Sequence, residues 1–111
     1  MSKGQGQRHF RIADQLMREI GRLLVEEVQD PRLELVTVSG VQLNPDMSRA
    51  TVFVTYMGDD DRHHNVEAAL GKAKGFLRSR IGRTCKLKRT PDLVFVFDEF
   101  LEEMVYERPE E

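Results

Sequence analysis

The stretch Arg-Ala-Thr-Val-Phe-Val-Thr-Tyr-Met, at residues 49–57, decides the fold. Val, Thr, Phe and Tyr dominate it, and these residue types favour β-strands. Its apolar side chains fall on both faces, with Val52 and Val54 on one and Phe53 on the other. A strand that is apolar on both faces needs cover on at least one of them. The stretch therefore predicts a sheet that packs under helices.

A second strand and a helix precede this stretch. Residues 35–43 have the same strand-favouring composition, and residues 44–48 (Asn-Pro-Asp-Met-Ser) are dense in turn formers. The two strands are therefore predicted to form an antiparallel hairpin. Apolar residues recur every three or four positions over residues 8–28, and Asp30-Pro31 ends that pattern. This spacing predicts an amphipathic first helix.

Helical sequence also follows the central stretch. Three aspartates at residues 59–61 precede an apolar helical pattern over residues 66–84, where carboxylates can cap unsatisfied backbone amides. Gly71 and Gly75 interrupt this pattern, so two helices joined at a kink are predicted. Residues 93–98 (Leu-Val-Phe-Val-Phe-Asp) then form a continuous apolar run that is typical of a buried strand.

The predicted order is helix, strand, strand, helix, kink, helix, strand. A helical crossover between the second and third strands favours parallel pairing with a right-handed connection. The predicted fold class is therefore α+β, with a mixed three-stranded sheet covered by helices on one face. We divide the 111 residues into a flexible N-terminal arm (1–7), one domain (8–98) and an acidic C-terminal tail (99–111).

Charge is distributed unevenly along the chain. The formal net charge is −2, which taken alone argues against a nucleic-acid partner. Residues 72–89, however, carry basic side chains and no acidic one, whereas the chain from Asp98 onward is mostly acidic. On the first predicted helix, Arg8, Arg11, Arg18 and Arg22 share the side opposite the apolar stripe. The distribution of charged residues along the chain is therefore more informative than the net charge.

The basic residues suggest contact with RNA. Each Lys or Arg brought to a phosphate releases condensed counterions, which gives salt-sensitive binding. A solvated surface is the alternative that spacing alone leaves open. Arg80 is set aside, because it lies near Phe76 and Ile81 and its stem can cover the apolar seam. The predicted RNA-binding residues are Lys72, Lys74, Gly75, Arg78, Arg83, Lys86, Lys88 and Arg89, with Arg8 and Arg11 secondary.

Gly75 has two readings within this set. It could let a phosphate approach the N-terminus of the second helix of the kinked pair. It could instead only permit a sharp turn between two helices. Both readings stay open at this point.

Other residues that could carry chemistry are better explained structurally. His63 and His64 point about 100° apart on a helix and make poor metal co-ligands, so a solvated helix cap is preferred. Cys85 has basic neighbours but no histidine close in sequence, and is interpreted as a small packed residue. No pair of carboxylates shows pocket-forming signals. No enzymatic activity, metal or cofactor is therefore predicted.

The aromatic residues, the single cysteine and the N-terminal residues allow further predictions. Phe53, Phe95 and Phe97 are interpreted as core residues rather than as stacking platforms for bases. A single cysteine cannot form an internal disulfide, and no run approaches the ~18 apolar residues that span a bilayer. Residues 1–7 resemble neither a secretory signal nor a transit peptide. A cytoplasmic location without membrane contact is expected.

Several segments, taken together, resemble the ribosome-binding factor A family. They span about Arg8 to Asp98 and are Asp30-Pro31-Arg32-Leu33, Leu43-Asn44-Pro45-Asp46-Met47-Ser48, Ala50-Thr51-Val52, Ala73-Lys74-Gly75-Phe76-Leu77-Arg78 and Arg89-Thr90-Pro91-Asp92-Leu93. The Gly-x-x-Gly loop of ordinary KH domains is missing, and Ala73-Lys74-Gly75 matches the helix-kink-helix variant of this family. The resemblance implies a type II KH-like fold that recognises folded RNA by shape and phosphates.

The resemblance also implies a function. It indicates a non-enzymatic ribosome assembly factor that binds the free small (30S) ribosomal subunit through its 16S rRNA during late maturation. It further implies processing of the rRNA 5′ end, a need in growth in the cold, and release by a ribosome-associated GTPase. We expect a monomer. The acidic tail departs from the longer, often basic tail of many relatives, and a protein-interaction adaptor that uses this tail is the competing hypothesis.

Overall fold

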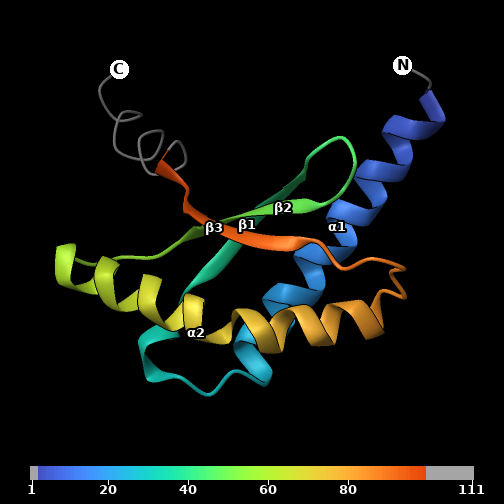
Figure 1. Cartoon of the computed structure of the whole chain (residues 1–111). Helices are drawn as coiled ribbons and strands as arrows, with labels where there is room; N and C mark the ends of the chain where they lie inside the picture. The colour runs from blue at the N-terminus through green and yellow to red at the C-terminus, as the bar shows by residue number, and fades with distance from the viewer. Residues whose placement is uncertain (1–2, 100–111) are drawn as a thin grey trace, which may run out of the picture.

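The computed structural model describes residues 3–99, and the side chains of residues 6–99, as two long helices beside a three-stranded sheet (Figure 1). The elements are α1 (Lys3–Glu26), the short 3-10 helix η1 (Pro31–Leu33), β1 (Thr37–Leu43), β2 (Arg49–Thr55), α2 (Asp60–Thr84) and β3 (Asp92–Phe97). The predicted α+β class is confirmed.

The sheet has β2 at its centre. β1 pairs with β2 antiparallel, and β3 pairs with β2 parallel, as the hairpin and the helical crossover predict. The register of β1 against β2 shifts between Val38 and Gly40, which marks a bulge. At the other end of β1, Leu43 lies opposite Ala50, close to the turn that joins the two strands.

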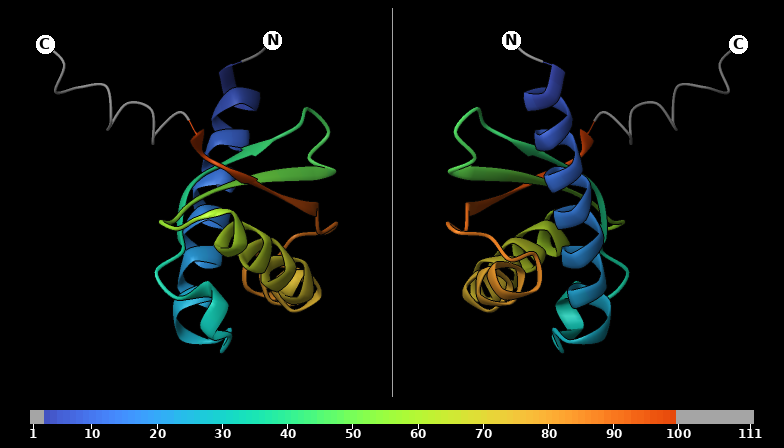
Figure 2. Two further views of the ribbon diagram at one scale, coloured as in Figure 1. Left: turned by 90° about the vertical axis from the view of Figure 1, so that its left-hand side faces the viewer. Right: turned by 90° about the vertical axis from the view of Figure 1, so that its right-hand side faces the viewer.

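The helices cover one face of the sheet, as predicted. On β2 the side chains of Ala50, Val52 and Val54 are buried, while those of Thr51, Phe53 and Thr55 are only half-buried. In Figure 2, α1 runs past the strands and α2 lies below them. Both helices contribute apolar side chains to a single core, among them Leu16, Ile20, Leu23, Leu70, Leu77 and Ile81.

The first helix begins earlier than predicted. It starts at Lys3, so the described part of the predicted flexible arm (3–7) is helical, and it ends at Glu26. Glycines at positions 4 and 6 disfavour helix, but extending a helix that already exists costs far less than starting one. At the other end, the backbone amide of Val28 still donates to the carbonyl oxygen of Leu23, at 2.9 Å.

The two predicted helices after β2 form one helix. α2 is continuous from Asp60 to Thr84, although its ribbon changes direction near the middle (Figure 1). Its buried residues Val66, Leu70, Ala73, Leu77 and Ile81 follow one another at spacings of three and four. Burial of this unbroken stripe outweighs the ~1 kcal/mol that each helical glycine costs relative to alanine. The helix break was therefore wrongly predicted.

The segment between α1 and β1 is fixed by Asp30. Its carboxylate accepts a hydrogen bond from the backbone amide of Arg32 at 3.0 Å and caps η1. The Arg32 guanidinium donates two more, from Nε and Nη2, at 3.0 and 2.7 Å. These hydrogen bonds lower the pKa of Asp30 to about 2. Asp30 and Arg32 thus hold Leu33 in place, and Leu33 is buried in the core.

Candidate RNA-binding surface

The loop between α2 and β3 carries three of the predicted RNA-binding residues, and its path is set where α2 ends. Lys86 adopts a left-handed backbone with a φ of 54°. The amide of Leu87 donates to the carbonyl oxygen of Gly82 at 3.2 Å, and that of Lys86 donates to Arg83 at 3.4 Å. These two hydrogen bonds form a Schellman motif, which reverses the chain sharply. Lys88 and Arg89 follow this reversal and are exposed.

Arg78 holds the same loop from the side of α2. Its Nε donates to the carbonyl oxygen of Pro91 and its Nη2 to that of Thr90, both at 3.0 Å. Arg78 is only half-exposed. Arg78 was predicted to contact RNA, and its guanidinium donates to the carbonyl oxygens of two consecutive residues at the end of the loop. These hydrogen bonds hold the end of the loop that carries Lys88 and Arg89, and RNA contact by Arg78 itself stays a prediction.

A close approach between Gly82 and Thr90 completes the loop. A Cβ built on Gly82 would lie 2.5 Å from the Thr90 hydroxyl oxygen, well inside the distance that real Cβ atoms keep. Only a glycine lets the loop lie this close to α2 without displacement. The helix end, Arg78 and this contact together give the loop one defined position.

The turn between β1 and β2 faces this loop. Asn44 closes the turn with its Oδ1, which accepts a hydrogen bond from the Arg49 amide at 2.8 Å. His9 of α1 reaches the turn, with its Nε2 2.8 Å from the carbonyl oxygen of Pro45. Met47 has a φ of 59° and is half-buried. The N-terminal half of α1 is thereby tied to the turn.

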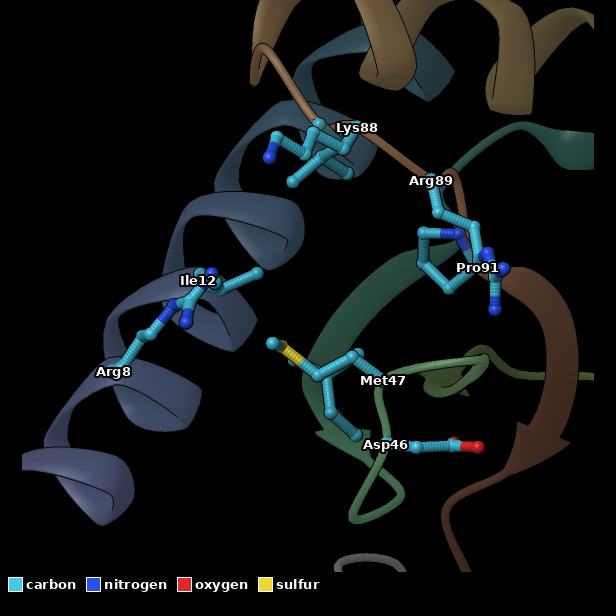
Figure 3. A pocket seen from close by; sticks show the side chains of 9 residues that line it. Arg8, Ile12, Asp46, Met47, Lys88, Arg89 and Pro91 are labelled. Carbon is cyan, nitrogen blue, oxygen red and sulfur yellow. The ribbon is translucent and has the colours of Figure 1, made fainter.

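These segments enclose a hollow of about 160 Å³, which we call the basic hollow (Figure 3). Arg8 and Ile12 of α1 face Met47 and Pro91 across it. Its interior is mainly apolar and its rim is mainly cationic. It is lined by Arg8, Ile12, Leu43, Asp46, Met47, Leu87, Lys88, Arg89 and Pro91.

The cations of the basic hollow keep their charge available. Arg8, Lys88 and Arg89 are exposed, and none of the ion pairs between described side chains involves them. Among the described residues that line the hollow, Asp46 is the one with an acidic side chain. Hydrogen bonds from the Ser48 hydroxyl and amide lower its pKa and keep it ionised. Its side chain points away from the gap between α1 and the turn (Figure 3).

The remaining predicted residues do not share one face. Lys74 lies on the β3 side, 3.8 Å from the Asp92 carboxylate, whereas Lys72 lies close enough to Asp30 to lower its pKa. Arg83 and Lys86 are exposed near the end of α2. Arg11 is exposed and lines a separate, shallower groove between α1 and the end of α2. The one-signed block in the sequence is therefore divided over two flanks of α2 and the loop.

Gly75 lies in the interior of α2. It is neither at the N-terminus of a helix, where a phosphate was predicted to approach, nor at a turn between two helices, so both predicted positions are wrong. The reason is the continuous helix described above. No atom of another described segment lies within 4 Å of a Cβ built there, and the residue is exposed.

Other basic residues are paired with carboxylates. Arg18 lies 3.0 Å from Asp14, as its i,i+4 spacing predicts. Arg22 contacts three glutamates, and hydrogen bonding to Glu19 is the main reason that its pKa is raised. Arg80 lies 2.7 Å from Glu27 and 4.8 Å from the centroid of the Phe76 ring. These contacts support leaving Arg80 out of the predicted RNA-binding residues.

Of the two neighbouring histidines, His64 is exposed as predicted, and His63 differs from prediction. His63 is not in a solvated cap: its Nδ1 lies 2.7 Å from the Tyr56 hydroxyl, and its ring packs edge-on against Phe97. Asp59 does cap α2, accepting from the Arg62 amide at 3.0 Å. Within the residues that the structure describes, no group of three His, Cys, Asp or Glu side chains is placed to hold a metal.

Cys85 and two of the three phenylalanines behave as predicted. Cys85 is buried, and burial raises the pKa of its thiol, which favours the unreactive form. Phe95 and Phe97 pack against the core, but Phe53 pairs with Val96 on the face of the sheet that points away from α1 and α2. No helix in the described part of the chain is long and apolar enough to cross a membrane. Of the predicted acidic tail (99–111), only Glu99 lies within the described residues.

Residues 8–107 match a known protein family. The model of the ribosome-binding factor A family matches residues 8–107. The chain belongs to this family. The resemblance read from the sequence is confirmed, and the match covers every described residue that lines the basic hollow.

Solved structures agree with this assignment. A crystal structure of ribosome-binding factor A from Thermus thermophilus matches with a TM-score of 0.69 at 28% identity, over 79% of this chain and 93% of that one. A Thermotoga maritima structure, solved by solution NMR as a candidate ribosome-binding factor A, matches with a TM-score of 0.62 at 34% identity. The match covers 76% of this chain and 84% of that one. A Thermus thermophilus model of the factor, fitted into a cryo-EM map of its complex with the 30S subunit, matches with a TM-score of 0.62 at 30% identity. The match covers 75% of this chain and 87% of that one.

Sequence reasoning missed the apolar interior of the basic hollow. Ile12, Leu43 and Leu87 follow ordinary core patterns, so nothing in the sequence separates them from the other core residues. Met47 was visible as a signal, because it is an apolar residue within an otherwise polar turn.

Proposed function

We propose that this chain is a non-enzymatic assembly factor that binds the free small ribosomal subunit through its 16S rRNA during late maturation. The observation that carries the proposal is the basic hollow. Arg8, Lys88 and Arg89 come from two distant parts of the sequence and meet, unpaired with described carboxylates, around one concavity. Cations held in this way suit the phosphates of RNA.

Membership of the family supports the ribosome as the partner. The relative from Thermus thermophilus was placed in a complex with the 30S subunit, and 75% of this chain aligns with it. The rigid loop supports docking on folded RNA, because fixed donors lose little entropy on binding. The other cations of the predicted set would add phosphate contacts around this centre; these are Lys72, Arg83, Lys86 and Arg11, which are exposed, and Lys74, which is half-buried. The exposed backbone at Gly75 leaves room for a further phosphate.

Several finer features belong to the same proposal. The factor would act in the cytoplasm as a monomer with a type II KH-like fold. Its binding would accompany processing of the rRNA 5′ end, would be needed for growth in the cold, and would end when a ribosome-associated GTPase releases it. Support for these features comes from family membership.

Sedimentation tests the proposal. Purified protein is mixed separately with small subunits, large subunits and assembled ribosomes, and each mixture is resolved on a sucrose gradient at two salt concentrations. The protein should follow the small subunits. Three phosphate contacts alone predict that affinity falls roughly 20- to 40-fold when salt rises fourfold, and each further contact makes the fall steeper. Equal binding to large subunits, or binding that salt does not weaken, contradicts the proposal.

A further inference from the structure

We infer that the basic hollow receives a single unstacked nucleotide of RNA, with its base in the apolar interior and its flanking phosphates on the cationic rim. This inference rests on the proposed function and names the RNA feature recognised at that surface. Sequence-specific proteins recognise RNA mostly through bases splayed out of the stack.

The interior fits one base. Ile12, Leu43, Met47, Leu87 and Pro91 give it apolar walls. Its volume of about 160 Å³ is well below the roughly 300–1,000 Å³ of pockets that bury drug-sized ligands. One ring system is therefore the scale of ligand that it can enclose. A base pair or a stack of bases is too large.

The rim fits the chain on either side of such a base. Arg8 lies on the α1 side of the hollow, and Lys88 and Arg89 lie on the side of the loop (Figure 3). A nucleotide inserted between them would have a phosphate within reach of cations on both sides. An apolar side chain of a protein has no such charges, so the charge pattern favours RNA over a protein segment.

Met47 provides a second observation. Its φ of 59° is in the left-handed region, which is unfavourable for a residue with a Cβ. This backbone directs the Met47 side chain into the gap between α1 and the strands (Figure 3). Strain of this kind is concentrated at binding sites. A thioether side chain is flexible and polarisable, and can adapt to the face of a ring.

The walls of the hollow are fixed before any ligand arrives. The contact of His9 with Pro45 ties α1 to the turn, and the two hydrogen bonds from Arg78 hold the opposite wall. A preformed site loses less conformational entropy on binding.

The Met47→Gly variant tests the inference. Glycine accepts the left-handed backbone, so the variant should fold at least as stably as the wild type while it lacks one wall of the hollow. Its affinity for small subunits should fall about tenfold, in line with the loss of one base contact. Leu35→Gly is the matched control, because Leu35 has a φ of 64°, is 85% exposed and does not line the hollow. Its affinity should equal that of the wild type.

A second measurement separates the base from the phosphates. Wild type and Met47→Gly are titrated by NMR with homohexanucleotides of A, C, G and U, and with an abasic ribose-phosphate hexamer. The wild type should bind at least one base-containing hexamer about tenfold more tightly than the abasic one, and Met47→Gly should lose that preference. Equal binding of all hexamers by the wild type overturns the inference, even if Met47→Gly binds subunits weakly, because a protein contact then explains the loss.

The inference and the proposed function fail in different ways. If Met47→Gly binds subunits like the wild type, the hollow does not receive a base, but docking through phosphates stands. If the wild type does not bind small subunits at all, the proposed function itself is wrong, and the inference falls with it.

Discussion

Arg78 in α2 donates a hydrogen bond from Nε to the carbonyl oxygen of Pro91, at 3.0 Å, and so ties the C-terminal part of the helix to the residue that precedes β3. A second hydrogen bond, from Nη2 to Thr90, holds the preceding residue. Sequence pattern places Arg78 among the RNA-binding cations. In the structure it holds the backbone that follows Lys88 and Arg89, and its own contact with RNA stays a prediction.

Arg78→Lys tests this positioning role. Lysine keeps the charge, but its ammonium on a flexible stem cannot reproduce two hydrogen bonds in the fixed geometry of a guanidinium. The variant should lose about 1 kcal/mol of stability in urea denaturation, and amide hydrogen exchange should become faster at residues 88–90. Affinity for small subunits should fall although the net charge is unchanged. If exchange and affinity both match the wild type, Arg78 does not position the loop.

Gly82→Ala should displace the same loop. The new Cβ would lie 2.5 Å from the Thr90 hydroxyl oxygen, so the ~1 kcal/mol that alanine contributes to a helix is offset by the clash. Gly75→Ala is the matched control in the same helix, because nothing lies within 4 Å of its Cβ. Thermal denaturation should show Gly75→Ala to be more stable than the wild type, and Gly82→Ala to be no more stable or less so. Equal stabilisation of both would show that Thr90 yields without cost.

The pH dependence of stability should reflect Asp30. Its pKa falls from the usual 3.8 to about 2 in the folded chain, so the folded state favours the ionised carboxylate. The resulting stabilisation is present above pH 4 and is lost as pH falls through 2. Asp30→Asn should therefore be less stable than the wild type at pH 7, and the difference should shrink towards zero near pH 2. Urea denaturation at both pH values measures this, and a difference that persists unchanged at pH 2 argues against the Arg32 contacts as the cause.

Much of the fold follows from local patterns. The alternation in β2, the turn at residues 44–48 and the apolar run of β3 predict the mixed sheet, because each depends on neighbours in sequence. The predicted break at Gly75 failed for a different reason. Helix propensity is a local quantity, whereas the stripe from Val66 to Ile81 is buried against the sheet and η1.

The site was only partly predictable. Lys88 and Arg89 were recognisable as basic residues, but their meeting with Arg8 depends on the packing of α1 beside the hairpin. Which basic side chain pairs with which carboxylate likewise depends on the tertiary structure. Nothing in the spacing indicates that Arg80 meets Glu27, 53 positions away, or that Arg78 donates to the backbone of the loop. Charge patterns locate cations in the sequence, and packing decides which of them remain available.

The most direct test of the central claim removes the three cations of the basic hollow. The variant Arg8→Ala, Lys88→Ala, Arg89→Ala is compared with Arg18→Gln, Arg22→Gln, Arg80→Gln, which loses the same charge from arginines that are paired with carboxylates. Circular dichroism confirms that both variants fold, and co-sedimentation with small subunits measures their binding. The first variant should leave the small-subunit fractions while the second stays in them. Equal binding by both, or a loss confined to the second, contradicts docking through the basic hollow.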